Sequence, residues 1–240
     1  MLGDVSVTFR LADGKGYTAI ERASLSVASS EFVAIVGPTG CGKSTLLNVA
    51  AGLLAPSAGT VSIFGARLQG LNRDAGYLFQ SDALFPWKTA LENVAIGLDT
   101  AGAPKAEAQG RAQAWLARVG LAQVLIRDPK ILLMDEPFGP LDAQTRLIMG
   151  NLLLDLWSAD RKAVLFVTHE LEEAIALADR VVIMSAGPAA RIIGDWTVAL
   201  PRPRDIAEVR LEPAFHKLHR EIWHSLKAEV LKTYAEGGGG

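Results

Sequence analysis

The chain has 240 residues, of which 50% are hydrophobic and 21% are charged, so it can bury the core of one large α/β domain and lacks the composition of a disordered segment. Its formal net charge of −2 gives no general attraction for nucleic acid. The single cysteine, Cys41, excludes an internal disulfide framework and fits a reducing compartment.

The sequence contains no stretch with the length of a membrane span or the pattern of a signal peptide. Asp4 and Arg10 interrupt the first residues before an apolar core forms. The longest apolar runs, residues 131–134 and 163–167, have the length of strands. We therefore expect a soluble protein that reaches a membrane only through a partner.

Predicted strands and helices alternate along the chain. Apolar and alternating runs predict strands at residues 5–9, 24–28, 31–36, 61–64, 77–79, 131–134, 164–167, 181–184 and 191–193. Helical patterns predict one helix that ends near residue 51 and others at residues 89–98, 105–119, 143–157 and 171–178. This alternation predicts an α/β fold with a mostly parallel sheet flanked by helices on both faces.

The character of the sequence changes at Pro201. After Pro213, apolar residues recur at helical spacing and predict an amphipathic helix with its apolar positions at Phe215, Leu218, Ile222, Leu226 and Val230. The four final glycines indicate a flexible end. We therefore divide the chain into a main domain, residues 1–200, and a C-terminal helix with a glycine tail, residues 201–240.

One motif in the main domain indicates a nucleotide site. Residues 37–45 read Gly-Pro-Thr-Gly-Cys-Gly-Lys-Ser-Thr, which matches the phosphate-binding pattern G-x-x-x-x-G-K-[ST], and they stand between a predicted strand and a predicted helix. Gly37, Gly40 and Gly42 allow the backbone to curl so that its N–H groups surround phosphate oxygens. Thr45 completes the motif at the start of the helix. Lys43 would reach the outer phosphates, and the Ser44 hydroxyl would bind Mg²⁺.

Cys41 fills a variable position of the same motif. We assign it no role beyond its place among the nucleotide-binding residues of the loop. Because it lies near a predicted helix N-terminus, we expect a lowered thiol pKa and a loss of nucleotide binding on alkylation.

Two carboxylates follow the buried strand predicted at residues 131–134. Ligands collect at the carboxyl ends of parallel strands, so Asp135 is placed to hold Mg²⁺, mainly through water. Glu136 is placed to polarise the attacking water. The alternative, an acidic turn exposed to solvent, is weaker because a phosphate-binding motif stands upstream.

These motifs resemble those of the ATP-binding subunits of ABC transporters, and more narrowly those of nitrate, sulfonate and taurine importers. The stretches that carry the resemblance are residues 31–38, 37–45, 79–87, 89–94, 134–146 and 167–174. The resemblance covers about residues 5–200. It implies an ABC-type P-loop NTPase with an antiparallel β part near the N-terminus and a helical subdomain at about residues 81–125.

The resemblance also implies roles for individual residues. Phe9 matches the aromatic residue that stacks on adenine, with Tyr17 as the reserve candidate because either ring can stack. Gln80 matches the residue that senses Mg²⁺ and the attacking water. Asp142 matches the aspartate that communicates across a dimer, and His169 matches the histidine that contacts the γ-phosphate.

One part of the family pattern is missing. A Leu-Ser-Gly-Gly-Gln-like signature normally lies between the Gln80 region and the Asp135 strand, and here the flanking matches join directly near residues 123–125. The helical subdomain is therefore predicted to be reduced, with its truncation near residue 124. The gap is natural, engineered, or a segment missing from the sequence as written.

The missing signature bears on catalysis. In the family, two subunits face each other and each ATP lies between one phosphate loop and the signature of the partner subunit. A homodimer of this chain would lack that wall, so we expect ATP binding to survive and hydrolysis to be slow.

The implied function is that of an ATPase subunit on the cytoplasmic side of the inner membrane. Its partners would be a second ATP-binding subunit, two membrane-spanning permease subunits contacted by residues 80–93, and indirectly a periplasmic solute-binding protein. The alternatives are a nucleotide-binding module without turnover, or a soluble ABC-like ATPase not tied to a transporter. The transported solute is not readable from the sequence.

Overall fold

The computed structural model describes residues 1–80 and 128–237. Within these ranges the strands are β1 (Leu2–Arg10), β2 (Gly16–Leu25), β3 (Phe32–Val36), β4 (Ala58–Ile63), β5 (Ala66–Arg67), β6 (Ala75–Leu78), β7 (Ile131–Asp135), β8 (Ala163–Thr168), β9 (Arg180–Met184) and β10 (Ile192–Thr197). The helices there are α1 (Lys43–Ala50), α5 (Ala143–Ala159), α6 (Leu171–Leu177), α7 (Ile206–Val209) and α8 (Pro213–Gly237).

The larger sheet has the strand order β10-β9-β3-β8-β7-β6. Its strands are parallel except for β10, which runs antiparallel to β9 at the edge. Every residue of β3, β7 and β8 is buried, because layers cover both faces of a parallel sheet and leave no solvated side. The predicted α/β fold with a mostly parallel sheet is confirmed.

The smaller sheet is antiparallel, with the order β2-β1-β4-β5. The strand predicted at residues 24–28 was wrong in its bounds, because only residues 24 and 25 belong to a strand. β2 begins at Gly16, pairs with β1 along its length and ends at Leu25. The charged residues Glu21 and Arg22 interrupt the apolar pattern of this strand. Residues 26–28 have left the sheet before the chain turns at Ser30, whose φ is 64°.

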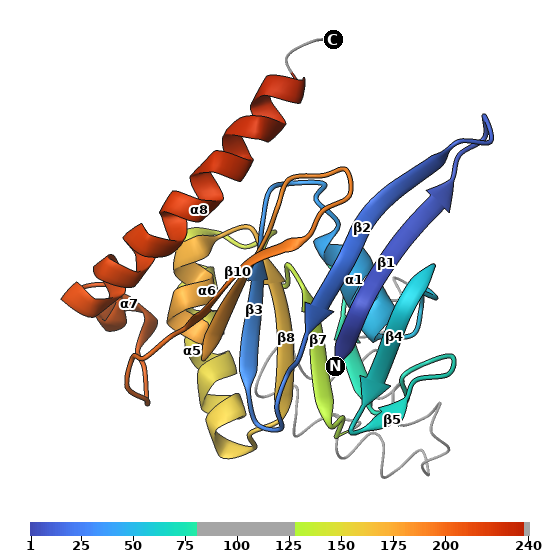
Figure 1. The fold of residues 1–240 in the computed structure, drawn as a ribbon. Coiled ribbons are helices and arrows are strands. Elements are labelled where there is room, and N and C mark those ends of the chain that lie inside the picture. The colour runs from blue at the N-terminus through green and yellow to red at the C-terminus, as the bar shows by residue number, and fades with distance from the viewer. Residues whose placement is uncertain (81–127, 238–240) are drawn as a thin grey trace, which may run out of the picture.

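The larger sheet separates two cores, which Figure 1 shows as layers on its two faces. Phe32, Ala34 and Val36 of β3 join the core formed with α5, α6 and α8. Val33 and Ile35 join the core formed with α1 and the smaller sheet. The strict alternation along β3 follows from the period of two in a strand.

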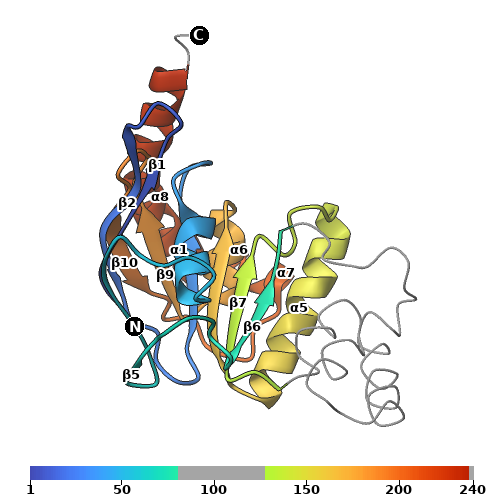
Figure 2. The same cartoon turned by 90° about the vertical axis from the view of Figure 1, so that its right-hand side faces the viewer.

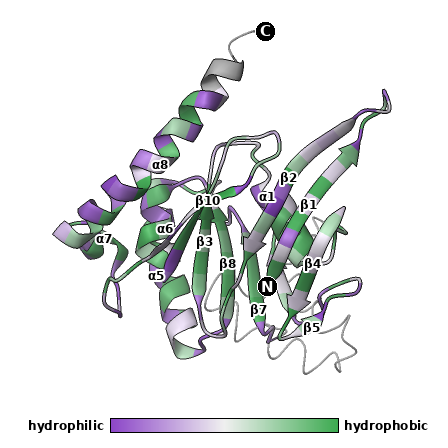
Figure 3. Ribbon diagram, viewed as in Figure 1, coloured by the Kyte–Doolittle hydropathy of each residue, from purple (hydrophilic) through white to green (hydrophobic). Residues whose placement is uncertain are grey.

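The predicted amphipathic helix is confirmed as α8. Its Phe215, Ile222 and Leu226 are buried in the first core, and Leu218 and Val230 pack against that core. Figure 3 shows polar residues along the rest of the helix surface. α8 extends to Gly237, so this glycine belongs to the helix rather than to the predicted tail.

The helices predicted at residues 89–98 and 105–119, and the helical subdomain at about residues 81–125, lie outside the described residues. The short elements β5 and α7 had no counterpart in the prediction. In the parts of the chain that the structure describes, no helix combines the length and the apolar character needed to cross a bilayer.

Candidate functional site

The predicted site residues follow strands that end side by side. β3 leads into the 37–42 loop, β7 ends at Asp135, β8 is followed by His169, and β6 leads to Gln80. The registers place Val36 opposite Thr168 and Asp135 opposite Val167, so these strands end at one edge of the sheet. Figure 2 shows β6 and β7 next to each other at that edge.

The glycines of the 37–42 loop are required for two different reasons. Gly40 and Gly42 have φ of 77° and 98°, a left-handed conformation that glycine adopts at no steric cost. A Cβ on Gly37 would lie 2.9 Å from the Cys41 sulfur and 3.0 Å from the Met184 carbonyl oxygen. The loop therefore packs too tightly for any larger residue at its first position, and α1 begins directly after it.

Lys43 places a buried positive charge inside this loop. Its ammonium nitrogen donates hydrogen bonds to the carbonyl oxygens of Gly37 at 2.9 Å and Pro38 at 3.0 Å, and the residue is only 5% exposed. Charge-assisted hydrogen bonds of this kind are stronger than neutral ones. Together with the N-terminal dipole of α1, the ammonium makes the loop attractive for phosphate.

Ser44 and Asp135 form an oxygen-rich pair beside the loop. The Ser44 hydroxyl donates to Asp135 Oδ1 at 2.9 Å, and the Tyr77 hydroxyl lies 3.5 Å from Oδ2 while donating to Asn48 Oδ1 at 3.0 Å. Burial raises the pKa of the Asp135 carboxyl above its usual value. The hydrogen bond from Ser44 acts in the opposite direction but is the smaller effect. A hydroxyl and a carboxylate converging here fit the oxygen ligands that Mg²⁺ prefers.

Glu136 connects two other strand ends. Its Oε2 accepts a hydrogen bond from Gln80 Nε2 at 3.0 Å and lies 3.2 Å from His169 Nδ1. Glu136 also has φ of 45°, a conformation that costs roughly 1–3 kcal/mol in a residue other than glycine and that clusters at functional sites. The structure thus brings together the three residues predicted to be catalytic.

Asp142 does not join this group of three. In the described residues its carboxylate bonds are made to the first turn of α5: Oδ1 accepts from the backbone N–H groups of Gln144 and Thr145, and Oδ2 accepts from the Thr145 hydroxyl at 2.6 Å. The Thr145 hydroxyl bond is the main cause that lowers the Asp142 pKa. Asp142 is a helix N-cap, and its predicted contact with a second subunit stays a prediction.

Arg146 joins the turn before α5 to the turn that carries His169. Its guanidinium donates to the Leu141 carbonyl oxygen at 3.2 Å and to Glu170 Oε1 at 3.2 Å. The same Glu170 oxygen lies 3.7 Å from His169 Nε2. Neither Arg146 nor Tyr77 was predicted as a site residue. No sequence pattern distinguishes an arginine at this helix position from an ordinary surface residue.

The two adenine candidates lie directly opposite each other. Phe9 in β1 pairs with Tyr17 in β2, and each residue is 39% exposed. A Cβ added to Gly187 would lie 3.9 Å from the Tyr17 hydroxyl and 3.6 Å from the Gly40 carbonyl oxygen. The Tyr17 hydroxyl and the phosphate loop therefore both lie beside Gly187, and this placement favours Tyr17 over Phe9.

The expectation of a lowered pKa at Cys41 was wrong. The residue is only 1% exposed, and burial raises the pKa of the thiol despite the opposing charge of Lys43. The desolvation of a buried thiolate outweighs the nearby cation and the helix N-terminus.

Cys41 should therefore resist alkylation. We expect iodoacetamide to leave the folded chain unlabelled at pH 8 under conditions that label the urea-unfolded chain completely, as read by intact mass. Its affinity for ATP should be unchanged by the treatment. Labelling of the folded and unfolded chains at similar rates would contradict the buried position of the thiol.

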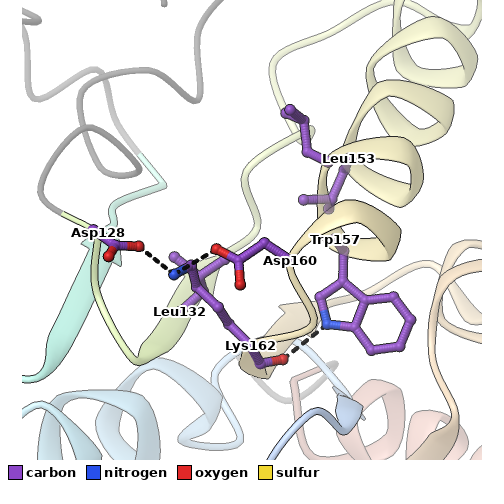
Figure 4. Close-up of a pocket in the computed structure, with 7 residues that line it drawn as sticks. Asp128, Leu132, Leu153, Trp157, Asp160 and Lys162 are labelled. Carbon is purple, nitrogen blue, oxygen red and sulfur yellow. Dashed lines mark hydrogen bonds and ion pairs between the residues drawn. The ribbon is translucent and has the colours of Figure 1, made fainter. Parts of the chain in front are cut away.

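A separate pocket lies at the opposite end of the strands, where β7 and β8 begin (Figure 4). Its lining is mainly apolar with three charged side chains, and the residues that line it are Asp128, Leu132, Leu153, Leu156, Trp157, Asp160 and Lys162. Lys162 pairs with Asp160 at 2.8 Å, and its carbonyl oxygen accepts from the Trp157 indole at 2.8 Å. This pocket shares no residue with the phosphate loop.

Comparison with known proteins identifies the family of this chain. Residues 20–139 match the model of the ABC transporter family, and the chain belongs to that family. It contains an ABC-type ATP-binding domain, a class that generally hydrolyses ATP.

Two relatives and one solved structure illustrate the similarity. A candidate ATP-binding protein of Brucella melitensis is 44% identical over 220 residues, covering 91% of this chain and 90% of the relative. The taurine import ATP-binding protein TauB of Mesorhizobium japonicum is 41% identical over 235 residues, covering 88% of this chain and 91% of the relative. The dimeric ATP-binding cassette MJ0796 bound to ADP and phosphate has a TM-score of 0.73 at 26% identity, covering 83% of this chain and 99% of that one.

Proposed function

We propose that this chain is the ATP-binding and ATP-hydrolysing subunit of an ABC importer for a small solute such as nitrate, a sulfonate or taurine. The observation that carries the proposal is the convergence of Gln80, Glu136 and His169 next to the loop that holds Lys43. Three strand ends deliver these side chains to one edge of the sheet.

Within one chain, the loop would bind the phosphates of ATP. Lys43 would exchange its carbonyl partners for the outer phosphate oxygens, and Tyr17 would stack on adenine. Ser44 and Asp135 would hold Mg²⁺, with Gln80 reaching it from the neighbouring strand end. When bound, the ion neutralises charge on the phosphates.

Glu136 would act on the water that attacks the γ-phosphate. Its carboxylate is held by Gln80 and His169, so it can orient that water and accept its proton. His169 would contact the γ-phosphate, and Asp142 at the start of α5 would contact the second subunit.

We further propose that the missing signature limits turnover. The support for this proposal is the sequence, in which the matches on either side of the expected signature join near residues 123–125. The partner subunit would then supply no signature to the second side of the ATP. ATP would still bind to the phosphate loop, but its hydrolysis would be slow.

In the cell the chain would work as a peripheral subunit on the cytoplasmic side of the inner membrane. A second copy, two permease subunits and indirectly a periplasmic solute-binding protein would complete the importer, with residues 80–93 as the surface that meets the permeases. The importer type rests on the taurine-import name of the Mesorhizobium relative and on the resemblance around Gln80.

Substituting Lys43 tests the nucleotide site. We expect Lys43→Ala to weaken ATP binding about thirtyfold, since a charged hydrogen-bond donor to phosphate is lost. Fluorescence titration with a labelled ATP analogue measures the affinity, and a melting curve confirms that the variant is folded. Lys217→Ala, at an exposed site on α8, is the matched control; equal affinities for both variants would contradict the proposal.

A pull-down separates the importer from a soluble ABC-like ATPase. Permeases encoded with the chain should be retained by the tagged protein in detergent. Retention should be lost after substitutions within residues 80–93. Capture of ribosomes or DNA in place of permeases would favour the soluble alternative.

A further inference from the structure

The turn between β9 and β10, residues 185–190, lies against the phosphate loop. A Cβ on Gly187 would be 3.6 Å from the Gly40 carbonyl oxygen, 3.8 Å from Cys41 Cα and 3.9 Å from the Tyr17 hydroxyl. These are ordinary van der Waals distances. The turn therefore packs beside the phosphate loop and Tyr17, which belong to the candidate nucleotide site.

One side of this turn is tied to the strand that carries Tyr17. The Ala189 N–H donates to the Thr18 carbonyl oxygen at 2.7 Å, and the Ala190 N–H donates to that of Ala19 at 3.0 Å. These two hydrogen bonds join the turn to β2.

The other side is tied to α8 through a buried carboxylate. Glu229 is 7% exposed, and its Oε2 accepts a hydrogen bond from the Ala186 N–H at 2.8 Å. Lys232 donates to Oε1 at 2.5 Å. Burial acts to raise the pKa of Glu229, and the bonds from Lys232 and Ala186 outweigh it, so the pKa lies below its usual value and the side chain is charged at neutral pH.

α8 is itself held firmly by the core. Three of its side chains, Phe215, Ile222 and Leu226, are buried against the layer that contains α6. Glu229 follows one helical turn after Leu226 on the same side of the helix. The apolar stripe thus fixes the position from which Glu229 reaches the turn.

We propose that Glu229 is a positioning residue through which α8 holds the 185–190 turn against the phosphate loop and Tyr17. The inference rests on the proposed nucleotide site. Binding of ATP and order in α8 are then linked, and linkage is reciprocal: if α8 favours ATP binding, bound ATP stabilises the contact between α8 and the turn.

The test combines affinity with hydrogen exchange. We expect Glu229→Ala to weaken ATP binding about fivefold, in the range typical of coupled sites. Glu229→Gln, which keeps an acceptor for the Ala186 N–H, should stay within about twofold of the wild type. The exposed Glu221→Ala on the same helix should leave the affinity unchanged.

The second test measures amide hydrogen exchange of the wild-type chain with and without ATP. Bound ATP should slow exchange of the Ala186 amide and of α8 around residue 229. Unchanged exchange in both regions at saturating ATP, or an equal affinity of Glu229→Ala and the wild type, would overturn the inference alone. A wild-type chain that binds no ATP would instead contradict the proposed function itself.

Discussion

Replacing Glu136 by glutamine should lower ATP hydrolysis about a thousandfold, because the carboxylate that accepts the proton of the attacking water is lost. The amide keeps the shape of the side chain and can still bond to Gln80 and His169. ATP affinity should therefore stay within about twofold of the wild type. Release of radiolabelled phosphate is the measurement, because the starting rate is expected to be slow.

The neighbouring acid Glu172 provides a matched control. It is exposed in the first turn of α6, so Glu172→Gln should leave both rate and affinity unchanged. A Glu136→Gln chain that hydrolyses ATP as fast as the wild type would remove Glu136 from the mechanism. Binding without measurable turnover in both chains would favour the nucleotide-binding module over the enzyme.

Adding the signature segment that we propose is missing should have the opposite effect on rate. We expect insertion of a Leu-Ser-Gly-Gly-Gln-like signature segment of the family after Gln123 to raise turnover about a hundredfold, because the signature would supply hydrogen-bond donors to the γ-phosphate across the dimer. The rate should also become dependent on protein concentration, since two chains must meet.

A glycine-serine insertion of equal length separates chemistry from chain length. That variant should keep the slow rate of the unmodified chain. A high rate in the unmodified chain would show that hydrolysis does not need the signature. A high rate with both insertions would show that chain length at this point, and not the signature, limits turnover.

The edge of the sheet that carries the site was predictable from the sequence. A buried parallel strand is a continuous apolar run, and the functional residues follow such runs at Val36, Met134 and Val167. Once the strands are placed, the convergence of Glu136 and His169 follows from topology. The fold class could be predicted for the same reason.

The contacts made by sequence-distant side chains could not be predicted. The choice between Phe9 and Tyr17 depends on how the hairpin lies beside Gly187, and no local pattern encodes that placement. The pKa of Cys41 depends on burial, which here outweighs the cation and the helix N-terminus. Glu229 reads as an ordinary polar residue of an amphipathic helix until the turn at Ala186 is brought against it.

The start of β2 was missed for a different reason. Its first half contains the strand-favouring residues Tyr17, Thr18 and Ile20, but it follows directly on a turn signal and the charged pair Glu21 and Arg22 breaks the apolar pattern after it. Pairing with β1 decides its conformation. The pairing of β2 with β1 depends on the folded arrangement of the chain, which the local sequence does not reveal.

The central claim is that the nucleotide site is complete for binding within one chain. Calorimetric titration of the purified protein with ATP and Mg²⁺ tests it most directly, repeated at chain concentrations that differ tenfold. We predict saturation at one ATP per chain with the same dissociation constant at each concentration. Absence of saturable binding, or an affinity that appears only as the chain concentration rises, would contradict the claim.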